Sequence, residues 1–300
     1  MKLNKFFVFL LSGLIFVSIF PFTIYIVQSE DNEMYDKMIY SFKERAEFDF
    51  ISFNLKGDEK AASEIVAKAK SDKPDAILLV GFLAIKEISA KFDNIPLILA
   101  MSSSIPQNIK DKKNTCGVIF DLDDATTIEY LKTAVPEMKS LGIIFSIENT
   151  VDYAKSFKSK SEELGVSMEL GNITSLEELP LACKMMKASG VKGIWLGRDK
   201  LIVSKAGFET LLKVTKDEGL PIIAPYTTFT QKGAAFSISP DLTNHGYIAG
   251  NLAIRLENGE LPSDIGFLKT EKVAFSYNKN MLKLFGINVI SSILEKAKEY

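Results

Sequence analysis

Few side chains in this sequence have the type and spacing that catalysis requires. The 300 residues contain one histidine, His245, and the local sequence does not supply both the nucleophile and the orienting carboxylate of a hydrolytic triad. A Gly-rich phosphate-binding loop and a Gly-x-Ser-x-Gly nucleophile elbow are also missing from the sequence. We therefore expect a binding protein that is not an enzyme and needs no cofactor, with His245 on a helix surface or between lobes. Turnover of a bound ligand would instead favour an exported enzyme.

The other reactive side chains favour structural roles. Asp121, Asp123 and Asp124 follow an apolar run, and we expect loop and helix N-terminal roles for them because acidic side chains suit the first turn of a helix. A metal site is the alternative. Cys116 and Cys183 are too few for a disulfide scaffold, so we expect two buried thiols rather than a bridge. A net charge of −2 offers no basic surface for nucleic acid.

The elements that would position a binding site alternate between strand and helix. Several of the expected strands are apolar along their whole length, as strands covered on both faces by helices must be. Helices of ten or so residues separate the strands, which is typical of a doubly wound parallel sheet. In the first half the expected strands are 23–27, 48–53, 76–80, 96–100 and 116–120, and the expected helices are 31–46, 58–70 and 83–92.

The same rhythm restarts near Leu141. Strands are expected at 141–145, 166–170, 191–196, 221–224 and 234–239, with helices at 150–164, 176–189 and 201–218 between them. The sequence thus predicts an α/β fold of two similar doubly wound parallel-sheet lobes joined by several crossings, which are natural hinges. We divide the chain into a leader (1–21), a first lobe (22–120, with the helix 243–257), a second lobe (121–240), and a crossing strand and tail (258–300) whose lobe stays open.

The leader predicts export. Lys2 and Lys5 precede an apolar stretch over residues 6–19, and a core of about 7–15 apolar residues behind a positive start is typical of a secretory signal. A spanning helix needs roughly 20 apolar residues. Because no small-x-small cleavage site is evident around residues 18–22, an uncleaved N-terminal anchor is the alternative. Either interpretation places the domain on the periplasmic or extracellular face.

A series of short motifs carries a family resemblance, most clearly from about Leu141 to Phe267. The order and spacing of these motifs resemble the substrate-binding proteins of ABC transporters with the periplasmic binding protein type I fold, a family that includes tryptophan and tyrosine binders. Where that family tends to show Thr-Asp-Asn after a strand, this chain has Arg198, Asp199 and Lys200. The motifs are Phe145 to Thr150, Trp195 to Lys200, Leu220 to Ile223, Gly233-Ala234, Asp241 to Gly246 and the tail from Asn278 to Ile287.

The resemblance implies a monomer that closes its lobes on a small ligand, an amino acid or related carboxylate, and delivers it to an ABC transporter permease. Membrane contact would come only through the leader or the permease. The runner-up is a membrane-tethered ligand-sensing domain that signals to a partner protein. Arg198 and Lys200 would favour an anionic ligand and argue against a simple aromatic amino acid.

The resemblance also implies a ligand site, since ligands of open α/β sheets bind outside the carboxyl ends of the strands. Thr150 and Asn149 stand at a helix start, where free backbone N–H groups attract a carboxylate. Asp199 would receive an α-ammonium, and its removal is expected to weaken binding without lowering the stability of the unliganded protein. The remaining candidates at strand ends are Ser29, Glu30, Gly81, Phe82, Ser102, Ser103, Tyr226 and Asp241.

Each candidate also has a plainer interpretation. Asn149, Thr150, Asp199 and Asp241 would serve equally well as helix N-caps, whose oxygen atoms accept from the free N–H groups of the first turn. Trp195 has an aromatic surface for stacking on a ligand, as do Phe82, Phe145 and Tyr226, but its place within a strand favours the core.

Overall fold

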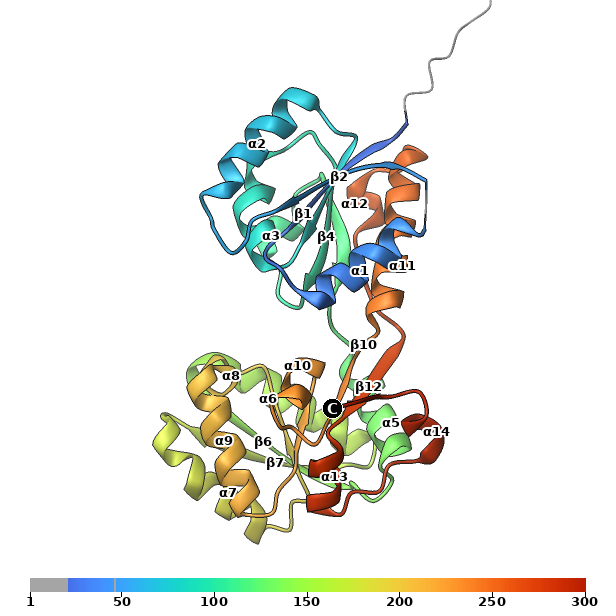
Figure 1. Ribbon diagram of the computed structural model, residues 1–300. Helices are drawn as coiled ribbons and strands as arrows, with labels where there is room; N and C mark the ends of the chain where they lie inside the picture. The colour runs from blue at the N-terminus through green and yellow to red at the C-terminus, as the bar shows by residue number, and fades with distance from the viewer. Residues whose placement is uncertain (1–20, 46) are drawn as a thin grey trace, which may run out of the picture.

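Two lobes, each built on a parallel-rich sheet, make up the protein (Figure 1). The computed structural model describes residues 21–45 and 47–300, so the apolar stretch of the predicted leader lies outside the described residues. Lobe 1 carries a six-stranded sheet in the order β11-β5-β4-β3-β1-β2. Lobe 2 carries a seven-stranded sheet in the order β13-β12-β10-β9-β8-β6-β7. The predicted α/β class with two parallel-sheet lobes is confirmed.

The strands of lobe 1 all pair in parallel, and helices cover both faces of the sheet. All five residues of β3 are buried for this reason. One core lies under α1 and α11, and a second lies under α2 and α3. The strands are β1 (Thr23–Gln28), β2 (Asp49–Asn54), β3 (Ala76–Val80), β4 (Leu97–Ser102), β5 (Thr115–Ile119) and β11 (Phe267–Lys269). The helices are α1 (Glu33–Lys43), α2 (Ala61–Asp72), α3 (Phe82–Ile88), α4 (Gln107–Lys110), α11 (Leu242–Glu257) and α12 (Pro262–Ile265).

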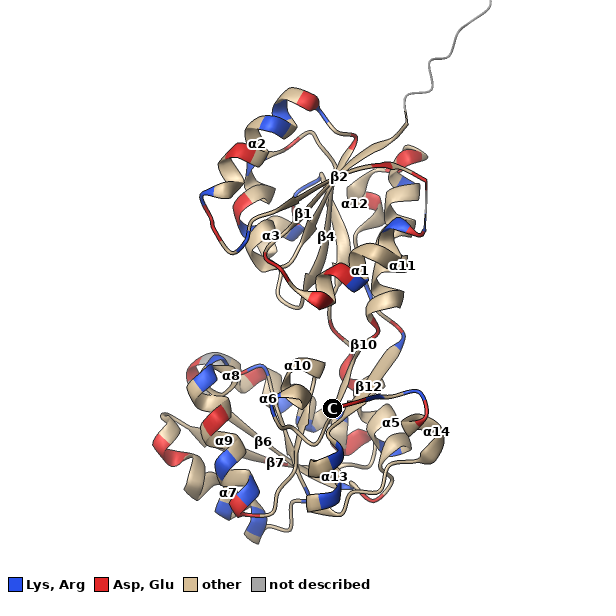
Figure 2. Cartoon of the chain, in the orientation of Figure 1, with Lys and Arg blue, Asp and Glu red and all other residues tan. Residues whose placement is uncertain are grey.

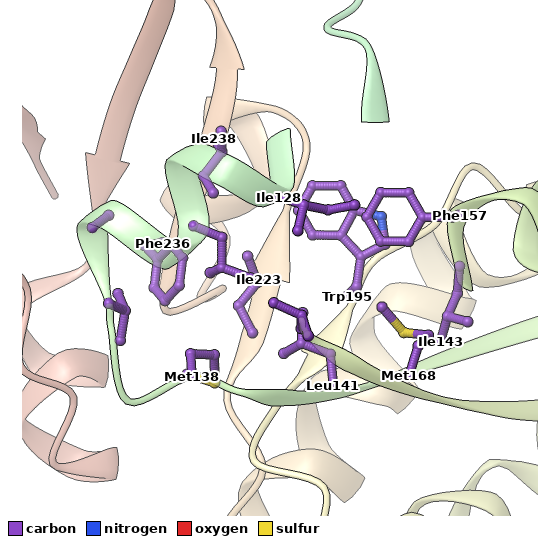
Figure 3. Packing of buried hydrophobic residues seen from close by; sticks show 14 of the residues in the cluster. Ile128, Met138, Leu141, Ile143, Phe157, Met168, Trp195, Ile223, Phe236 and Ile238 are labelled. Atoms are coloured by element: carbon purple, nitrogen blue, oxygen red, sulfur yellow. The ribbon is translucent and has the colours of Figure 1, made fainter. Parts of the chain in front are cut away.

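Lobe 2 repeats this arrangement, except that β12 runs antiparallel to β10. In its main core the rings of Trp195 and Phe157 stack with centroids 5.1 Å apart (Figure 3), so Trp195 takes the core role that its position favoured. The strands are β6 (Ser140–Ser146), β7 (Ser167–Ile173), β8 (Ile194–Trp195), β9 (Ile222–Ala224), β10 (Phe236–Pro240), β12 (Val273–Tyr277) and β13 (Lys298–Glu299). The helices are α5 (Asp124–Ala134), α6 (Ile147–Glu163), α7 (Leu179–Ala188), α8 (Lys200–Val203), α9 (Lys205–Asp217), α10 (Thr227–Gln231), α13 (Lys279–Phe285) and α14 (Ser291–Leu294).

Three segments of the described chain connect the lobes at a narrow waist (Figure 1). Residues 120–123 lead from β5 to α5, Asp241 leads from β10 to α11, and residues 270–272 lead from β11 to β12. The segment whose lobe the sequence left open is therefore divided. Its first part, with α12 and β11, belongs to lobe 1, and β12 to β13 belong to lobe 2.

One predicted helix, 201–218, is in fact two. Ser204 has a ψ of 158°, which ends α8, and its hydroxyl then accepts from the backbone N–H of Gly207 as the N-cap of α9. Gly207 permits this sharp junction, because a Cβ atom there would lie 2.1 Å from the backbone oxygen of Leu201. Helical periodicity continues across the junction in the sequence and does not reveal the break.

Cysteine placement agrees with the sequence-based expectation. Cys116 in β5 and Cys183 in α7 are free, buried and in different lobes. Burial raises the pKa of both thiols to about 12. Side chains of both charge signs are spread over the helices of both lobes (Figure 2). Among the helices within residues 21–45 and 47–300, none combines the length and the apolar character that a bilayer span would need.

Candidate ligand-binding cleft

At the cleft edge of lobe 2, Asp199 organises a cluster of hydrogen bonds. Its side chain is buried at the start of α8, where Oδ1 accepts from the backbone N–H groups of Leu201 (2.9 Å) and Ile202 (3.2 Å). Oδ2 accepts from the backbone N–H (2.8 Å) and the hydroxyl (2.6 Å) of Ser146 and from the hydroxyl of Thr150 (2.8 Å). Burial opposes ionisation, but these hydrogen bonds hold the pKa of the carboxyl below its usual value.

Five donors on one buried carboxylate change the expectation for its removal. Loss of Asp199 would take the charged acceptor from the backbone N–H groups of Leu201 and Ile202 and from the Thr150 hydroxyl, so we expect the unliganded protein to lose stability. The structure therefore favours a loss of stability over the unchanged stability that the sequence suggested. Thr150 has a φ of −144° and interrupts the first turn of α6, which lets its hydroxyl reach Asp199. The prediction for Asn149 falls on a side chain outside the described part of the structure.

Lobe 1 presents its edge differently. The Ser29 hydroxyl donates to the backbone oxygen of Val80 and accepts from the backbone N–H of Ala84, both at 2.9 Å, so it caps the start of α3. Gly81 precedes α3 with a φ of 88°, and a Cβ atom there would lie 2.5 Å from the Tyr35 hydroxyl. Beside these groups the side chain of Phe82 is 52% exposed.

Tyr35 is a candidate residue at this edge that the sequence analysis missed. Burial raises the pKa of its hydroxyl, and the nearby Glu30 carboxylate adds to the rise. Tyr35 therefore lies at the same edge as Glu30 and Gly81. Its position in the first turn after β1 was the available signal, because that turn stands at the carboxyl end of the sheet.

The next strand of lobe 1 ends in a β-bulge. The pairing of β4 with β5 shifts register between Leu99 and Ser102, and Met101 between them has a φ of 57°. The Ser102 hydroxyl is buried and donates to the backbone oxygen of Ser104 at 2.9 Å, whereas Ser103 is exposed. Of the two predicted serines, only Ser103 thus presents its side chain to solvent.

Tyr226 approaches this edge from lobe 2. Its ring stacks on Phe120, with centroids 5.7 Å apart and planes 15° apart. Burial and the nearby Asp121 raise the pKa of the Tyr226 hydroxyl, and Ser103 of lobe 1 lies close enough to oppose that rise. Tyr226 and Ser103 are therefore predicted site residues that the fold brings together from different lobes.

The charges near this point are paired. Arg198 follows β8 and forms an ion pair with Asp121. The Cζ atom of Arg198 lies over the Tyr153 ring, 5.0 Å from the ring centroid. The Tyr153 hydroxyl accepts from the Trp195 indole nitrogen at 3.1 Å. Burial raises the pKa of Asp121, although Arg198 opposes the rise. Asp123 accepts from both the backbone N–H and the hydroxyl of Thr126, each at 2.7 Å, which is the helix N-terminal role that the sequence predicted.

Asp241 stands at the crossing from β10 to α11. Its Oδ1 accepts from the backbone N–H of Asn244 at 2.7 Å and caps α11. It also lines a groove of about 350 Å³ between the lobes, with Asn32 and Lys37 from the α1 side, Gln231 from α10 and Lys298 from β13.

Comparison with known proteins places this architecture in a family. The model of a family described as ABC transporter substrate binding protein matches residues 40–300. This chain belongs to that family. The substrate-binding protein is 25% identical over 254 residues to a tyrosine-binding protein of Clostridioides difficile (strain R20291), covering 80% of this chain and 71% of the relative.

Solved structures share the fold of this substrate-binding protein. A ligand-free, open substrate binding protein with adhesive properties from Clostridium difficile superposes with a TM-score of 0.76 at 19% identity, covering 93% of this chain and 98% of that one. An ABC domain in complex with L-Trp from Streptococcus pneumonia superposes with a TM-score of 0.61 at 21% identity, covering 92% of this chain and 98% of that one. The resemblance read from the motifs is thus confirmed.

Proposed function

We propose that this substrate-binding protein serves an ABC importer on the extracytoplasmic face and closes its two lobes on an amino acid or related small carboxylate. The observation that supports the proposal is that strand-end residues of the two lobes meet, because Ser103 of lobe 1 lies beside Tyr226 of lobe 2. We propose that Glu30 and Phe82 on lobe 1 and the Asp199 cluster on lobe 2 line the same cleft, since they also follow strand ends. A ligand that contacts both edges favours the closed arrangement, because only that arrangement makes all the contacts. A permease would then recognise the closed form.

The Asp199 cluster supports recognition of the α-amino and α-carboxyl groups. Thr150 and Ser146 are hydroxyl donors to a carboxylate that is already ionised, and hydroxyl groups rotate at little cost. We propose that the Thr150 hydroxyl turns toward the ligand carboxylate, beside the start of α6, and that the ligand ammonium takes its place on Asp199 Oδ2. Charge-assisted hydrogen bonds of this kind are stronger than neutral ones.

The side chain of the ligand is proposed to be apolar or aromatic. Phe82 and Tyr226 supply ring surfaces on opposite lobes, and pockets for small molecules mix apolar walls with a few polar groups. Arg198 is already paired with Asp121, which neutralises one of the two charges that favoured an anionic ligand, and the other, Lys200, is exposed to solvent. The names of the tyrosine-binding relative and of the structure with L-Trp support the same class.

Thermal unfolding of residues 21–300 against L-tyrosine, L-tryptophan, other amino acids, small carboxylates, sugars and nucleosides tests the proposal. A ligand at about 100 times its Kd adds roughly 2.7 kcal/mol of stability, which raises the Tm by several degrees. We expect aromatic amino acids to give the shift and small-angle scattering to show a smaller radius with ligand bound. A shift with sugars or nucleosides alone would refute the amino-acid class.

A further inference from the structure

The β-bulge at the end of β4 places strain at the cleft edge of lobe 1. Met101 has a φ of 57°, a region that side chains other than glycine rarely adopt, and the ladder to β5 shifts register at this residue. Bulges re-aim the side chains that follow them. Here the residue re-aimed toward solvent is Ser103, which lies beside the Tyr226 hydroxyl of lobe 2.

His245 satisfies the backbone group that the bulge removes from the ladder. The Met101 N–H donates to Nε2 of His245 at 3.2 Å, and a buried N–H without such a partner would be costly. Because Nε2 accepts, the neutral ring carries its proton on Nδ1 and donates it to the Thr270 hydroxyl at 2.7 Å. The ring is completely buried, and burial lowers its pKa to about 3, so it stays neutral.

The three crossings between the lobes meet around this ring. His245 lies in the first turn of α11, directly after the crossing at Asp241, and its backbone N–H donates to the Asp241 oxygen. Thr270 belongs to the crossing from β11 to β12. Phe120, at the start of the crossing to α5, packs edge-on against His245 with centroids 5.2 Å apart and planes at 90°. Phe120 in turn stacks on Tyr226.

The helix that carries His245 is seated firmly in lobe 1. A Cβ atom at Gly246 would lie 2.3 Å from the backbone oxygen of Met38, so α11 touches the backbone of α1 at this turn. The Ser41 hydroxyl of α1 also donates to the backbone oxygen of Thr243 at 2.7 Å. His245 is therefore fixed relative to lobe 1, while Thr270 and Phe120 lead toward lobe 2.

We infer that His245 is a positioning residue of the hinge: Nε2 holds the bulge that presents Ser103, and Nδ1, through Thr270, sets the angle between the lobes. The cleft role of Ser103 rests on the proposed function, whereas the hinge role does not depend on any ligand. Because each ring nitrogen makes a different hydrogen bond, a substitution can remove one bond and keep the other.

Two substitutions each keep one task. His245→Gln places an acceptor near the position of Nε2 and keeps the Met101 bond, while it loses the donor to Thr270. His245→Asn places a donor near the position of Nδ1 and keeps the Thr270 bond, while it loses the acceptor for Met101. His245→Leu loses both. Thr270→Val removes the Thr270 bond from the other side and leaves the Met101 bond in place.

Two measurements on the ligand-free full chain in detergent test the two roles separately: one follows the Met101 hydrogen bond and the other follows the arrangement of the lobes. Amide exchange at Met101 should accelerate roughly tenfold in the Asn and Leu variants, the factor expected from one lost hydrogen bond, and stay near wild type in the Gln variant and in Thr270→Val. The distribution of distances between spin labels at Lys70→Cys and Lys213→Cys should broaden in Gln, Leu and Thr270→Val and stay narrow in Asn. The buried native cysteines do not compete for label.

A destabilised control separates positioning from general loss of stability. Leu179→Ala opens a cavity in the second core of lobe 2, which contains no residue of the three crossings, and should move neither measurement. If Gln and Asn change both measurements alike, or if Leu179→Ala reproduces their effects, His245 is only a packed core residue and the inference fails. Should the Leu variant not fold, Gln, Asn and Thr270→Val still decide the question. A flat ligand panel would refute the proposed function and leave this result standing.

Discussion

At the lobe 2 edge of the cleft one buried carboxylate, Asp199, accepts five hydrogen bonds, whereas the lobe 1 edge is shaped by its backbone at Gly81 and Met101. The first edge is a prebuilt polar cluster whose parts stabilise one another. The second uses positive φ values to present exposed side chains such as Phe82. The difference predicts that substitutions in the Asp199 cluster of lobe 2 lower both the stability of the protein and its affinity for ligand. Substitutions of the exposed side chains of lobe 1 should lower the affinity alone.

Removal of the Asp199 carboxylate is the strongest way to break the comparison. Asp199→Ala should lower the free energy of unfolding by at least about 3 kcal/mol, because several buried donors lose a charged acceptor, and should weaken amino-acid binding at least about tenfold. Urea unfolding and titration calorimetry measure the two effects. Ser204→Ala is the matched control, since it removes only a helix N-cap worth about 1 kcal/mol. An equal loss in both variants would show that Asp199 is a simple cap.

His245 and Asp199 should affect the free energy of unfolding over different ranges of acid pH. The pKa of His245 falls from 6.5 unfolded to about 3 folded, so the unfolded state binds more protons and stability drops as pH falls below 6.5. The loss should reach about 2 kcal/mol at pH 5. Asp199 behaves differently: its pKa is lowered from 3.8, so its contribution is complete above that value and is lost only at lower pH.

Urea unfolding at pH 7 and pH 5 measures this difference, with His245→Gln as the control because it lacks the titrating group. The variant should lose much less stability than the wild type between the two pH values. An identical pH dependence in both proteins would assign the effect to other groups.

Gly81 tests whether the backbone of lobe 1 is shaped by contact as well as by strain. Gly81→Ala should destabilise by about 1–3 kcal/mol, because its φ is 88° and the new Cβ atom meets the Tyr35 hydroxyl. Gly57→Ala is the matched control: its φ is 75° and its Cβ position is open. Thermal unfolding should show the larger loss for Gly81→Ala. Equal losses of stability in the two variants would mean that the Tyr35 side chain moves aside at no cost.

Phe82 gives the smallest expected effect on stability. Phe82→Ala should change the free energy of unfolding by less than about 0.5 kcal/mol because the ring is half exposed, yet it should weaken binding of an aromatic amino acid measurably. Tyr40→Ala, at a more exposed ring on α1, is the control and should leave affinity unchanged. Unchanged affinity in both variants would remove Phe82 from the site and weaken the contrast between the edges.

Much of the local structure was predictable because its causes are local. Apolar runs and helical periodicity located the strands except the short β11 and β13, and the longer helices except α5. Asp123 and Asp241 cap helices within a few residues of their own positions. The motif order also identified the family. Ser204 was missed, since the apolar periodicity continues through it while the chain turns.

The sequence by itself therefore determined two lobes of alternating strands and helices and the family, and it predicted the edge at which a ligand would bind. Only the tertiary structure decided what the polar side chains at that edge do. Met101 and His245 are 144 residues apart in sequence, and Ser146 and Asp199 are 53 apart. No local pattern records such pairs, because hydrogen bonds and ring contacts between distant segments form only when the packed sheets bring them together.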